Sequence, residues 1–306
     1  MEQTERLSPR RQPVLLLRDY LGLCKLKVIS LIVFTAIVGM LLSTHGMVPW
    51  DAFLFGTLGI GLAAASGAAI NHVVDHRIDR IMARTRNRPL PRSSISQKNA
   101  LIFAISLGLL SMLILTFLVN PLTAWLTFIA LIGYAVIYTM FLKRSTPQNI
   151  VWGGAAGAAP PVLGWTAVTG EINQEALLLF LIIFIWTPPH FWALAIRRRK
   201  EYAKADIPML PVTHGVQFTK LHIVLYTAML FAVTLLPFVT HMSGHIYLAG
   251  AISLGIGFIY YAIKLYHTDS DQLAMKTFAY SIFYLSCLFA FFLVDHYARI
   301  FLRSWI

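Results

Sequence analysis

The sequence predicts an all-α, polytopic membrane protein, and three observations support this fold class. The chain of 306 residues is 58% hydrophobic and only 12% charged, whereas a soluble domain carries about 25% charged residues. Its uncharged runs are long enough to cross a bilayer, which takes about 20 apolar residues. Its Lys and Arg residues gather in alternate connections between these runs. We therefore expect a single integral membrane domain over 27–306, preceded by a cytoplasmic arm over 1–26 with no signal peptide.

Nine apolar stretches have the length of a transmembrane helix. They cover 27–45, 52–74, 99–119, 122–142, 149–169, 175–196, 219–240, 245–265 and 276–298. The fifth stretch is the least apolar, and its Gly and Ala residues allow close helix packing. Pro160–Pro161 predicts a bend in the fifth stretch, and Pro188–Pro189 predicts another in the sixth.

The positions of the basic residues predict the orientation. All but Arg299 and Arg303 of the 25 Lys and Arg residues lie in the arm or near the even-numbered connections. Because cytoplasmic connections are enriched in Lys and Arg, we expect a cytoplasmic N-terminus and an external C-terminus. This topology explains the net charge of +12 without a nucleic-acid partner. The two long inner connections, 75–98 and 197–218, are the expected place for chemistry.

A polar stripe follows the second stretch. Asn71, Asp75 and Asp79 recur every four residues, so on a helix they share one face. Such oxygen ligands suit Mg²⁺, which usually completes its coordination with water and substrate phosphate. The alternative is a solvated helix end whose acids pair with nearby arginines. Like charges four residues apart repel each other, which favours a bound cation between them.

Basic residues accompany this stripe. Arg84 and Arg88 come soon after it, and Lys143–Arg144 lie in the connection between the fourth and fifth stretches. Guanidinium groups match phosphate oxygens in geometry and charge. The alternative is that these residues only mark the cytoplasmic side.

The second long inner connection contains Glu201, Tyr202 and Asp206, so it also combines acids with bases. Asp206 could instead cap a helix ahead of Pro208. Acids that hold Mg²⁺ and bases that neutralise phosphate suggest the ionisation of a prenyl diphosphate. The resulting carbocation would need a dry, aromatic pocket. The fourth to sixth stretches supply candidates, each of which could instead face lipid or the core: Phe128, Tyr134, Tyr138, Trp152, Trp165, Phe184, Trp186, Phe191 and Trp192.

Several blocks of the sequence resemble the UbiA-type intramembrane prenyltransferases. The segment from NHVVDHRIDR (71–80) through PLPR (89–92) is similar to the family signature, in the form found in members that farnesylate haem B. YTMFLKRSTPQNIVWGGAAGAAPPVLGW (138–165), WTPPHFWALAI (186–196) and IPMLPVTHG (207–215) resemble further blocks of those members. Together these matches cover roughly 70–215.

The resemblance implies nine helices around a central cavity that opens to the cytoplasmic side. It also implies transfer of a farnesyl group from farnesyl diphosphate to the 2-vinyl group of haem B, giving haem O for a terminal oxidase. The expected Mg²⁺ ligands are Asn71, Asp75, Asp79 and Glu201. Catalytic roles are expected for Asn71, Asp75, Asp79, Arg84 and Lys143. Substrate contacts are expected from Arg88, Arg144, Tyr138, Glu201, Tyr202, Asp206, His190 and Trp186.

The resemblance also implies a location in a bacterial inner membrane. Besides its two substrates and the lipid bilayer, the expected partners are a downstream haem A synthase or terminal oxidase assembly. His190 lies among aromatic residues within the sixth stretch, where a histidine is a functional candidate. We expect it to contact haem as an axial ligand or through a propionate; the alternative is an internal hydrogen bond.

Three positions depart from the family pattern. Ser93 stands where the signature ends in glycine, and Asp206 stands where the family often has glycine. Glu201–Tyr202 replaces the usual Asp–Tyr pair, which keeps the charge but lengthens the reach of the carboxylate.

Three alternative functions remain open at this point. A prenyltransferase of the same fold could act on a quinone precursor or a chlorin. A transporter or channel would be expected to carry its acids near the bilayer midplane, whereas here they lie at one end of the spans. The pattern of His72, Asp75 and His76 superficially matches a zinc protease motif, but the polar stripe explains Asp75 better.

Overall fold

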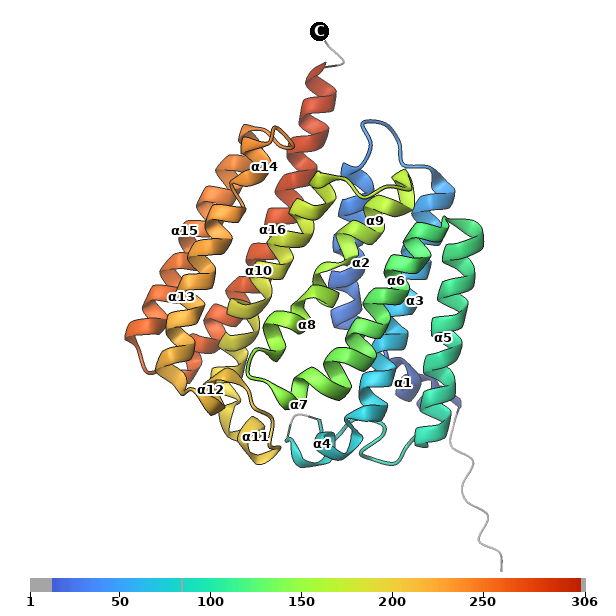
Figure 1. Cartoon of the computed structure of the whole chain (residues 1–306), viewed down its shortest axis with the longest axis vertical. Coiled ribbons are helices and arrows are strands. Elements are labelled where there is room, and N and C mark those ends of the chain that lie inside the picture. The colour runs from blue at the N-terminus through green and yellow to red at the C-terminus, as the bar shows by residue number, and fades with distance from the viewer. Residues whose placement is uncertain (1–12, 84, 304–306) are drawn as a thin grey trace, which may run out of the picture.

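A computed structural model describes residues 13–83 and 85–303, and every regular element in these ranges is a helix. Residues 1–12 of the predicted arm lie outside them, as does Arg84. The long helices stand side by side in one bundle (Figure 1). They are α2 (Leu26–Leu42), α3 (Trp50–Val74), α5 (Gln97–Leu118), α6 (Pro121–Ile132), α10 (Gln174–Arg197), α13 (Val216–Val233), α15 (His245–His267) and α16 (Asp271–Arg303). The shorter helices are α1 (Pro13–Leu23), α4 (His76–Ile81), η1 (Gly133–Leu142), α7 (Lys143–Ser145), α8 (Asn149–Ala158), α9 (Pro160–Thr169), α11 (Arg199–Lys204), α12 (Leu210–Thr213) and α14 (Leu236–Val239).

Seven of the described helical segments are long and apolar enough to cross a membrane. The pair α1 and α2, which meet at 56°, would provide an eighth crossing. Large apolar side chains on the outer surface, such as Phe117 and Trp125, agree with contact to lipid. The chain is therefore a multi-pass membrane protein.

The predicted fifth span, 149–169, is divided into α8 and α9. The break falls at Ala159, directly before Pro160–Pro161, because proline lacks an N–H and its ring blocks the preceding helical turn. The helix is interrupted where the bend is predicted, and neither half alone is long enough to span. The nine predicted spans are thus not all found as single helices. In contrast, α10 continues as one helix through Pro188 and Pro189.

Small residues allow the helices to pack closely. A Cβ atom added to Gly39 of α2 would lie 2.1 Å from the carbonyl oxygen of Pro161 in α9. A Cβ atom on Gly164 of α9 would lie 1.9 Å from the carbonyl oxygen of Ala36. Only glycine permits this crossing, since the two backbones touch. The predicted role of the small residues in the fifth stretch is thereby confirmed.

Serine hydroxyls join α3 to α5. Ser66 donates to the carbonyl oxygen of Ala104 at 2.7 Å, and Ser111 donates to that of Gly59 at 2.6 Å. Within a membrane such bonds satisfy polar groups that lipid cannot. These two bonds hold the middle of α3 against α5 and so fix the helix whose end carries the polar stripe.

The two ends of the bundle differ. The short helices α4, α7, α11 and α12 gather at one end, and α16 ends at the other (Figure 1). At the second end, the buried carboxylate of Asp295 accepts hydrogen bonds from the N–H groups of Gly244, Ile246 and Tyr247 at the start of α15. Asp295 is thereby held mainly by backbone N–H groups, with Arg299 3.9 Å away, whereas Asp75 and Asp79 at the first end have basic partners at 2.5 Å and 2.8 Å.

Candidate active site

The polar stripe lies at the junction between α3 and α4. Asp75 stands between the two helices with φ −85° and ψ 1°. Its N–H donates to the carbonyl oxygen of Asn71 at 2.9 Å, and the N–H of Asp79 donates to that of Asp75 at 2.8 Å. The helical spacing therefore continues through the junction, and Asn71 and Asp75 meet as the sequence predicts. All three side chains are buried.

Asp75 is held mainly by Asn71 of α3 and by Lys143 of α7. Its Oδ2 accepts hydrogen bonds from Lys143 Nζ at 2.5 Å and from Asn71 Nδ2 at 2.9 Å. Its Oδ1 is buried and accepts no hydrogen bond from the described residues, although Arg144 Nη2 lies 3.8 Å away. A buried carboxylate needs such compensation, because desolvation costs several kcal/mol per ion. Asp75 Oδ1 is therefore available to bind a cation.

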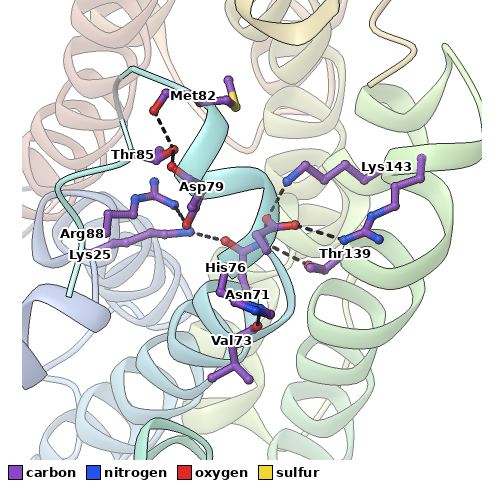
Figure 2. A network of polar contacts seen from close by, with 12 residues as sticks. Lys25, Asn71, Val73, His76, Asp79, Met82, Thr85, Arg88, Thr139 and Lys143 are labelled. Carbon is purple, nitrogen blue, oxygen red and sulfur yellow. Dashed lines mark hydrogen bonds and ion pairs between the residues drawn. The ribbon is translucent and has the colours of Figure 1, made fainter. Parts of the chain in front are cut away.

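Asp79 is held by the loop that follows it. Arg88 Nη1 donates to its Oδ2 at 2.8 Å (Figure 2). Thr85 fixes this loop, because its buried hydroxyl donates to the backbone carbonyl oxygen of Asp79 at 2.9 Å. The structure thus brings Arg88, Lys143 and Arg144 to the acids, as expected for residues of one site.

Lys25 is a site residue that the sequence reasoning missed. It lies at the break between α1 and α2, outside both helices, with a left-handed φ of 53°. Its Nζ donates to Asn71 Oδ1 at 2.6 Å. Arg88 and Lys143 lie near enough to Lys25 to act on its charge, so the three bases gather at one place. Its place just before the first apolar stretch was the available signal, but every basic residue in the arm also fits the topology rule.

The charge balance at this junction is positive. Four basic side chains, those of Lys25, Arg88, Lys143 and Arg144, surround the carboxylates of Asp75 and Asp79. With all groups ionised, the local charge is +4 and −2, which leaves +2. Because charges interact strongly where water is scarce, such a site favours a polyanion.

The second long connection has a different arrangement. Glu201 Oε1 lies 3.8 Å from Arg198 of its own segment, and its buried Oε2 accepts no hydrogen bond from the described residues. Within residues 13–83 and 85–303, no three His, Cys, Asp or Glu side chains are grouped so that they could hold a metal. The role of Glu201 as a fourth Mg²⁺ ligand therefore stays a prediction, as does the substrate contact expected from Asp206.

Tyrosines connect the two regions. Tyr202 is buried, and Tyr138 lies near both Tyr202 and Asp75. Tyr138 belongs to η1, a π-helix, and such helices often occur at functional sites. The ring of Tyr138 stacks on that of Tyr134 with 5.8 Å between ring centres. The second connection thus approaches the polar stripe through aromatic rings.

Neighbouring residues hold this tyrosine pair in place. Thr139 Oγ1 donates to the carbonyl oxygen of Tyr134 at 2.7 Å and accepts from Asn71 Nδ2 at 3.3 Å. A Cβ atom on Gly153 of α8 would lie only 2.3 Å from the ring of Tyr138. The glycine is therefore what leaves room for the ring beside α8.

The other predicted aromatic residues divide into two groups. Phe128 and Trp152 are 42% and 66% exposed, so they lie on the outer surface and do not line a central pocket. Trp186 is buried, and its Nε1 donates to the carbonyl oxygen of Ser281 in α16 at 2.8 Å. His190 stacks on Trp186, and its Nδ1 lies 2.7 Å from Ser281 Oγ. The internal hydrogen bond considered for His190 is therefore present, and it occupies one of the two ring nitrogens.

Comparisons with known proteins identify the family of this chain. The UbiA prenyltransferase family matches residues 32–290. A protoheme IX farnesyltransferase of Nitrosococcus oceani is 67% identical over 285 residues, which cover 93% of this chain and 95% of that protein. The protein of the same name from Thioalkalivibrio sulfidiphilus is 66% identical over 92% of this chain and 93% of its own length.

Solved structures show the same fold at low sequence identity. A digeranylgeranylglyceryl phosphate synthase is 21% identical with a TM-score of 0.77, over 92% of this chain and 98% of that one. A UbiA homolog from Archaeoglobus fulgidus, bound to GPP and Mg²⁺, is 16% identical with a TM-score of 0.59, over 90% of this chain and 99% of that one. On the extent of the family match and the identity to its relatives, this chain belongs to the UbiA prenyltransferase family.

Proposed function

We propose that the protein transfers the farnesyl group of farnesyl diphosphate to the 2-vinyl group of haem B, giving haem O. The observation that carries this proposal is the buried stripe of Asn71, Asp75 and Asp79, whose two acids lie among four basic side chains. The excess of positive charge suits a diphosphate. The choice of haem as acceptor rests on the names of the relatives that are 67% and 66% identical.

The donor set of the stripe fits Mg²⁺. Carboxylate and amide oxygens are its usual protein ligands, and Asp75 Oδ1 still lacks a hydrogen bond among the described residues. Asn71, Asp75 and Asp79 would hold the ion, with Glu201 as a fourth ligand from the second connection. When bound, Mg²⁺ would neutralise the diphosphate and so favour its departure. The Archaeoglobus homolog with GPP and Mg²⁺ supports this assignment by its fold.

The basic residues stabilise the leaving group. As the bond between farnesyl C1 and oxygen breaks, its electron pair leaves with pyrophosphate. Arg88, Lys143 and Arg144 already lie within 4 Å of the acids and need only turn toward the phosphate oxygens. Lys25 is placed to do the same from the opposite side of Asn71. Arg84 is proposed as a further phosphate contact from its sequence match.

The aromatic residues protect the allylic cation. The stacked Tyr134 and Tyr138 present ring faces, which attract a cation, close to Asp75. The π electrons of the haem vinyl group then form the new carbon–carbon bond to farnesyl C1. Water adds to the resulting cation and loses a proton, which completes the hydroxyethylfarnesyl group. Tyr202 and Trp186 are proposed to line the acceptor side.

A product assay tests this function. Purified protein is supplied with farnesyl diphosphate, Mg²⁺ and haem B, and the porphyrin products are analysed by mass spectrometry. We expect haem O with Mg²⁺ and none after chelation. A parallel reaction receives 4-hydroxybenzoate in place of haem B. Farnesylated 4-hydroxybenzoate without haem O would contradict the proposal and indicate a quinone-type enzyme of the same fold.

The proposed setting is a bacterial inner membrane, with the polar stripe on the cytoplasmic side and the C-terminus outside. The product would pass to a haem A synthase or to terminal oxidase assembly. Single cysteines in place of the exposed Lys200 and Glu171, which the proposal puts on opposite sides, test the orientation. A membrane-impermeant thiol reagent added outside should label the second position only, and labelling of the first would reverse the topology.

A further inference from the structure

From the contacts of one histidine we infer that the Nε2 atom of His190 is the axial ligand of the haem iron. This inference rests on the proposed function, since haem must be the acceptor. His190 lies in α10, seven residues before its end at Arg197. At 1.5 Å per residue, it stands about 10 Å below the inner end of the helix.

The hydrogen bonds around His190 determine which nitrogen carries the proton. Ser281 Oγ lies 2.6 Å from the carbonyl oxygen of Phe278, and a carbonyl oxygen only accepts. Ser281 therefore donates its single hydroxyl proton to Phe278. His190 Nδ1, at 2.7 Å from Ser281 Oγ, must then be the donor in their bond. In a neutral ring with its proton on Nδ1, the lone pair is on Nε2.

The ring is also fixed in orientation. Trp186 stacks on it with 4.1 Å between ring centres, and Phe278 stacks on it at 4.6 Å. The indole of Trp186 is held in turn by its bond to the carbonyl oxygen of Ser281. Axial ligation uses the edge of an imidazole, so the stacked rings do not obstruct it. Metal-bound histidines typically donate their other N–H to a neighbouring group in this way.

The surroundings favour the iron over a propionate as the partner of His190. Its recorded contacts, Trp186, Phe278 and Ser281, carry no charge. A propionate is a carboxylate and would need a cationic partner in such an environment. Neutral imidazole is a common metal ligand. Within the described residues, His190 Nε2 makes no hydrogen bond, so no bond has to be broken before it binds iron.

Spectroscopy of the haem complex tests this inference without the prenyl donor. The full chain in lipid nanodiscs is titrated with ferric haem B and followed by the Soret band and by electron paramagnetic resonance. We expect the signature of histidine ligation in the wild type. His190→Ala should lose it and bind haem at least about tenfold more weakly. His222→Ala, which changes a partly exposed histidine of α13, is the control and should match the wild type.

Three further measurements separate ligation from packing. Metal-free protoporphyrin IX has no iron, so the wild type and His190→Ala should bind it within about twofold of each other. His190→Gly with added imidazole should regain the spectrum of a nitrogen ligand. Ser281→Ala should keep ligation but raise the ferric/ferrous midpoint potential, because the imidazole loses the acceptor that increases its basicity.

The outcomes distinguish the two proposals. If His190→Ala and the better-matched His190→Gln retain the wild-type spectrum and haem affinity, the ligand assignment is wrong. That result would leave the proposed reaction standing as long as the wild type makes haem O. If the wild type shows His190 ligation but yields no haem O with farnesyl diphosphate and Mg²⁺, the reaction fails and the haem site remains.

Discussion

The two long connections, 75–98 and 197–218, have similar compositions but different structures. In the first, Asp75 and Asp79 are buried and make hydrogen bonds of 2.5 Å and 2.8 Å to Lys143 and Arg88. In the second, Glu201 is half-buried and its nearest basic group is 3.8 Å away. Arg199 of that connection pairs instead with Asp271 at the start of α16. Acids and bases in one segment therefore do not by themselves make a polar site.

The difference comes from the helices that carry the two segments. The first acids continue the end of α3, which is buried along much of its length and packs closely on α5. Their side chains enter the bundle and must find partners there. The second segment folds into α11, a helix of six residues in which only Tyr202 is buried. Its charged side chains stay near the surface, where ion pairs contribute little.

The largest effect is expected at Asp75. Asp75→Asn removes the carboxylate that bonds Lys143 and is proposed to bind Mg²⁺, so haem O formation should fall about 10²–10³-fold. Turnover with purified protein measures this. Asp271→Asn, which removes an acid paired with the second connection, should keep activity within about threefold. If both variants lost turnover equally, the acids of the two connections would not differ in function.

A smaller loss is expected at Lys25. Lys25→Gln removes one of the four positive charges while keeping a donor near Asn71. The KM for farnesyl diphosphate should rise about tenfold, since a charged hydrogen bond contributes about 1.5–3 kcal/mol. Lys27→Gln changes an exposed lysine two residues away and serves as the control. An unchanged KM in Lys25→Gln would show that Lys25 only supports the fold.

A substitution of Glu201 tests directly whether the second connection contributes less to turnover than the first. Because its carboxylate is half-buried and loosely paired, Glu201→Gln should reduce turnover by only about tenfold, much less than Asp75→Asn. The Mg²⁺ concentration at half-maximal activity is measured alongside and should rise. A loss as large as that of Asp75→Asn would mean that substrate binding draws the second connection into the site.

Gly153 tests the aromatic link between the two connections. A methyl group there would lie 2.3 Å from the Tyr138 ring, so Gly153→Ala should displace the ring and lower turnover about threefold. Overpacking of this kind costs about 1–3 kcal/mol, which thermal unfolding in detergent would detect. Gly157→Ala adds the same methyl where nothing lies within 4 Å. Similar losses in both variants would point to a general helix effect.

The smallest effect is expected at Ser93, which closes the first connection. Ser93 has φ of +56°, a conformation that costs a residue with a Cβ about 1 kcal/mol or more. Ser93→Gly should therefore raise the unfolding free energy by about 1 kcal/mol without changing turnover. Ser94→Gly is the control, and it should bring no gain because the Ser94 hydroxyl bonds the carbonyl oxygen of Pro89.

The backbone φ angles explain two of the departures from the family pattern. The family resemblance leads one to expect glycine at Ser93 and often at Asp206, and both residues have positive φ, +56° and +51°. The resemblance therefore contained the information that these turns are left-handed. It did not show that a serine and an aspartate adopt the same turns here.

Most of the helices and one side of the site could be predicted from the sequence, because both depend on short-range patterns. Apolar runs indicated most of the spans, and the four-residue spacing brought Asn71 next to Asp75. Pro160–Pro161 marked the break between α8 and α9. Each of these follows from residues close together in the chain.

Only the tertiary structure decided which distant residues complete the site. Lys25 reaches Asn71 across 46 positions and Lys143 reaches Asp75 across 68, while Glu201 stays with Arg198 of its own segment. Packing also placed Trp152 on the surface and Trp186 in the interior, although both are tryptophans in apolar helices. Periodicity specifies the face of a helix, but the partner that covers the face depends on how helices far apart in sequence pack together.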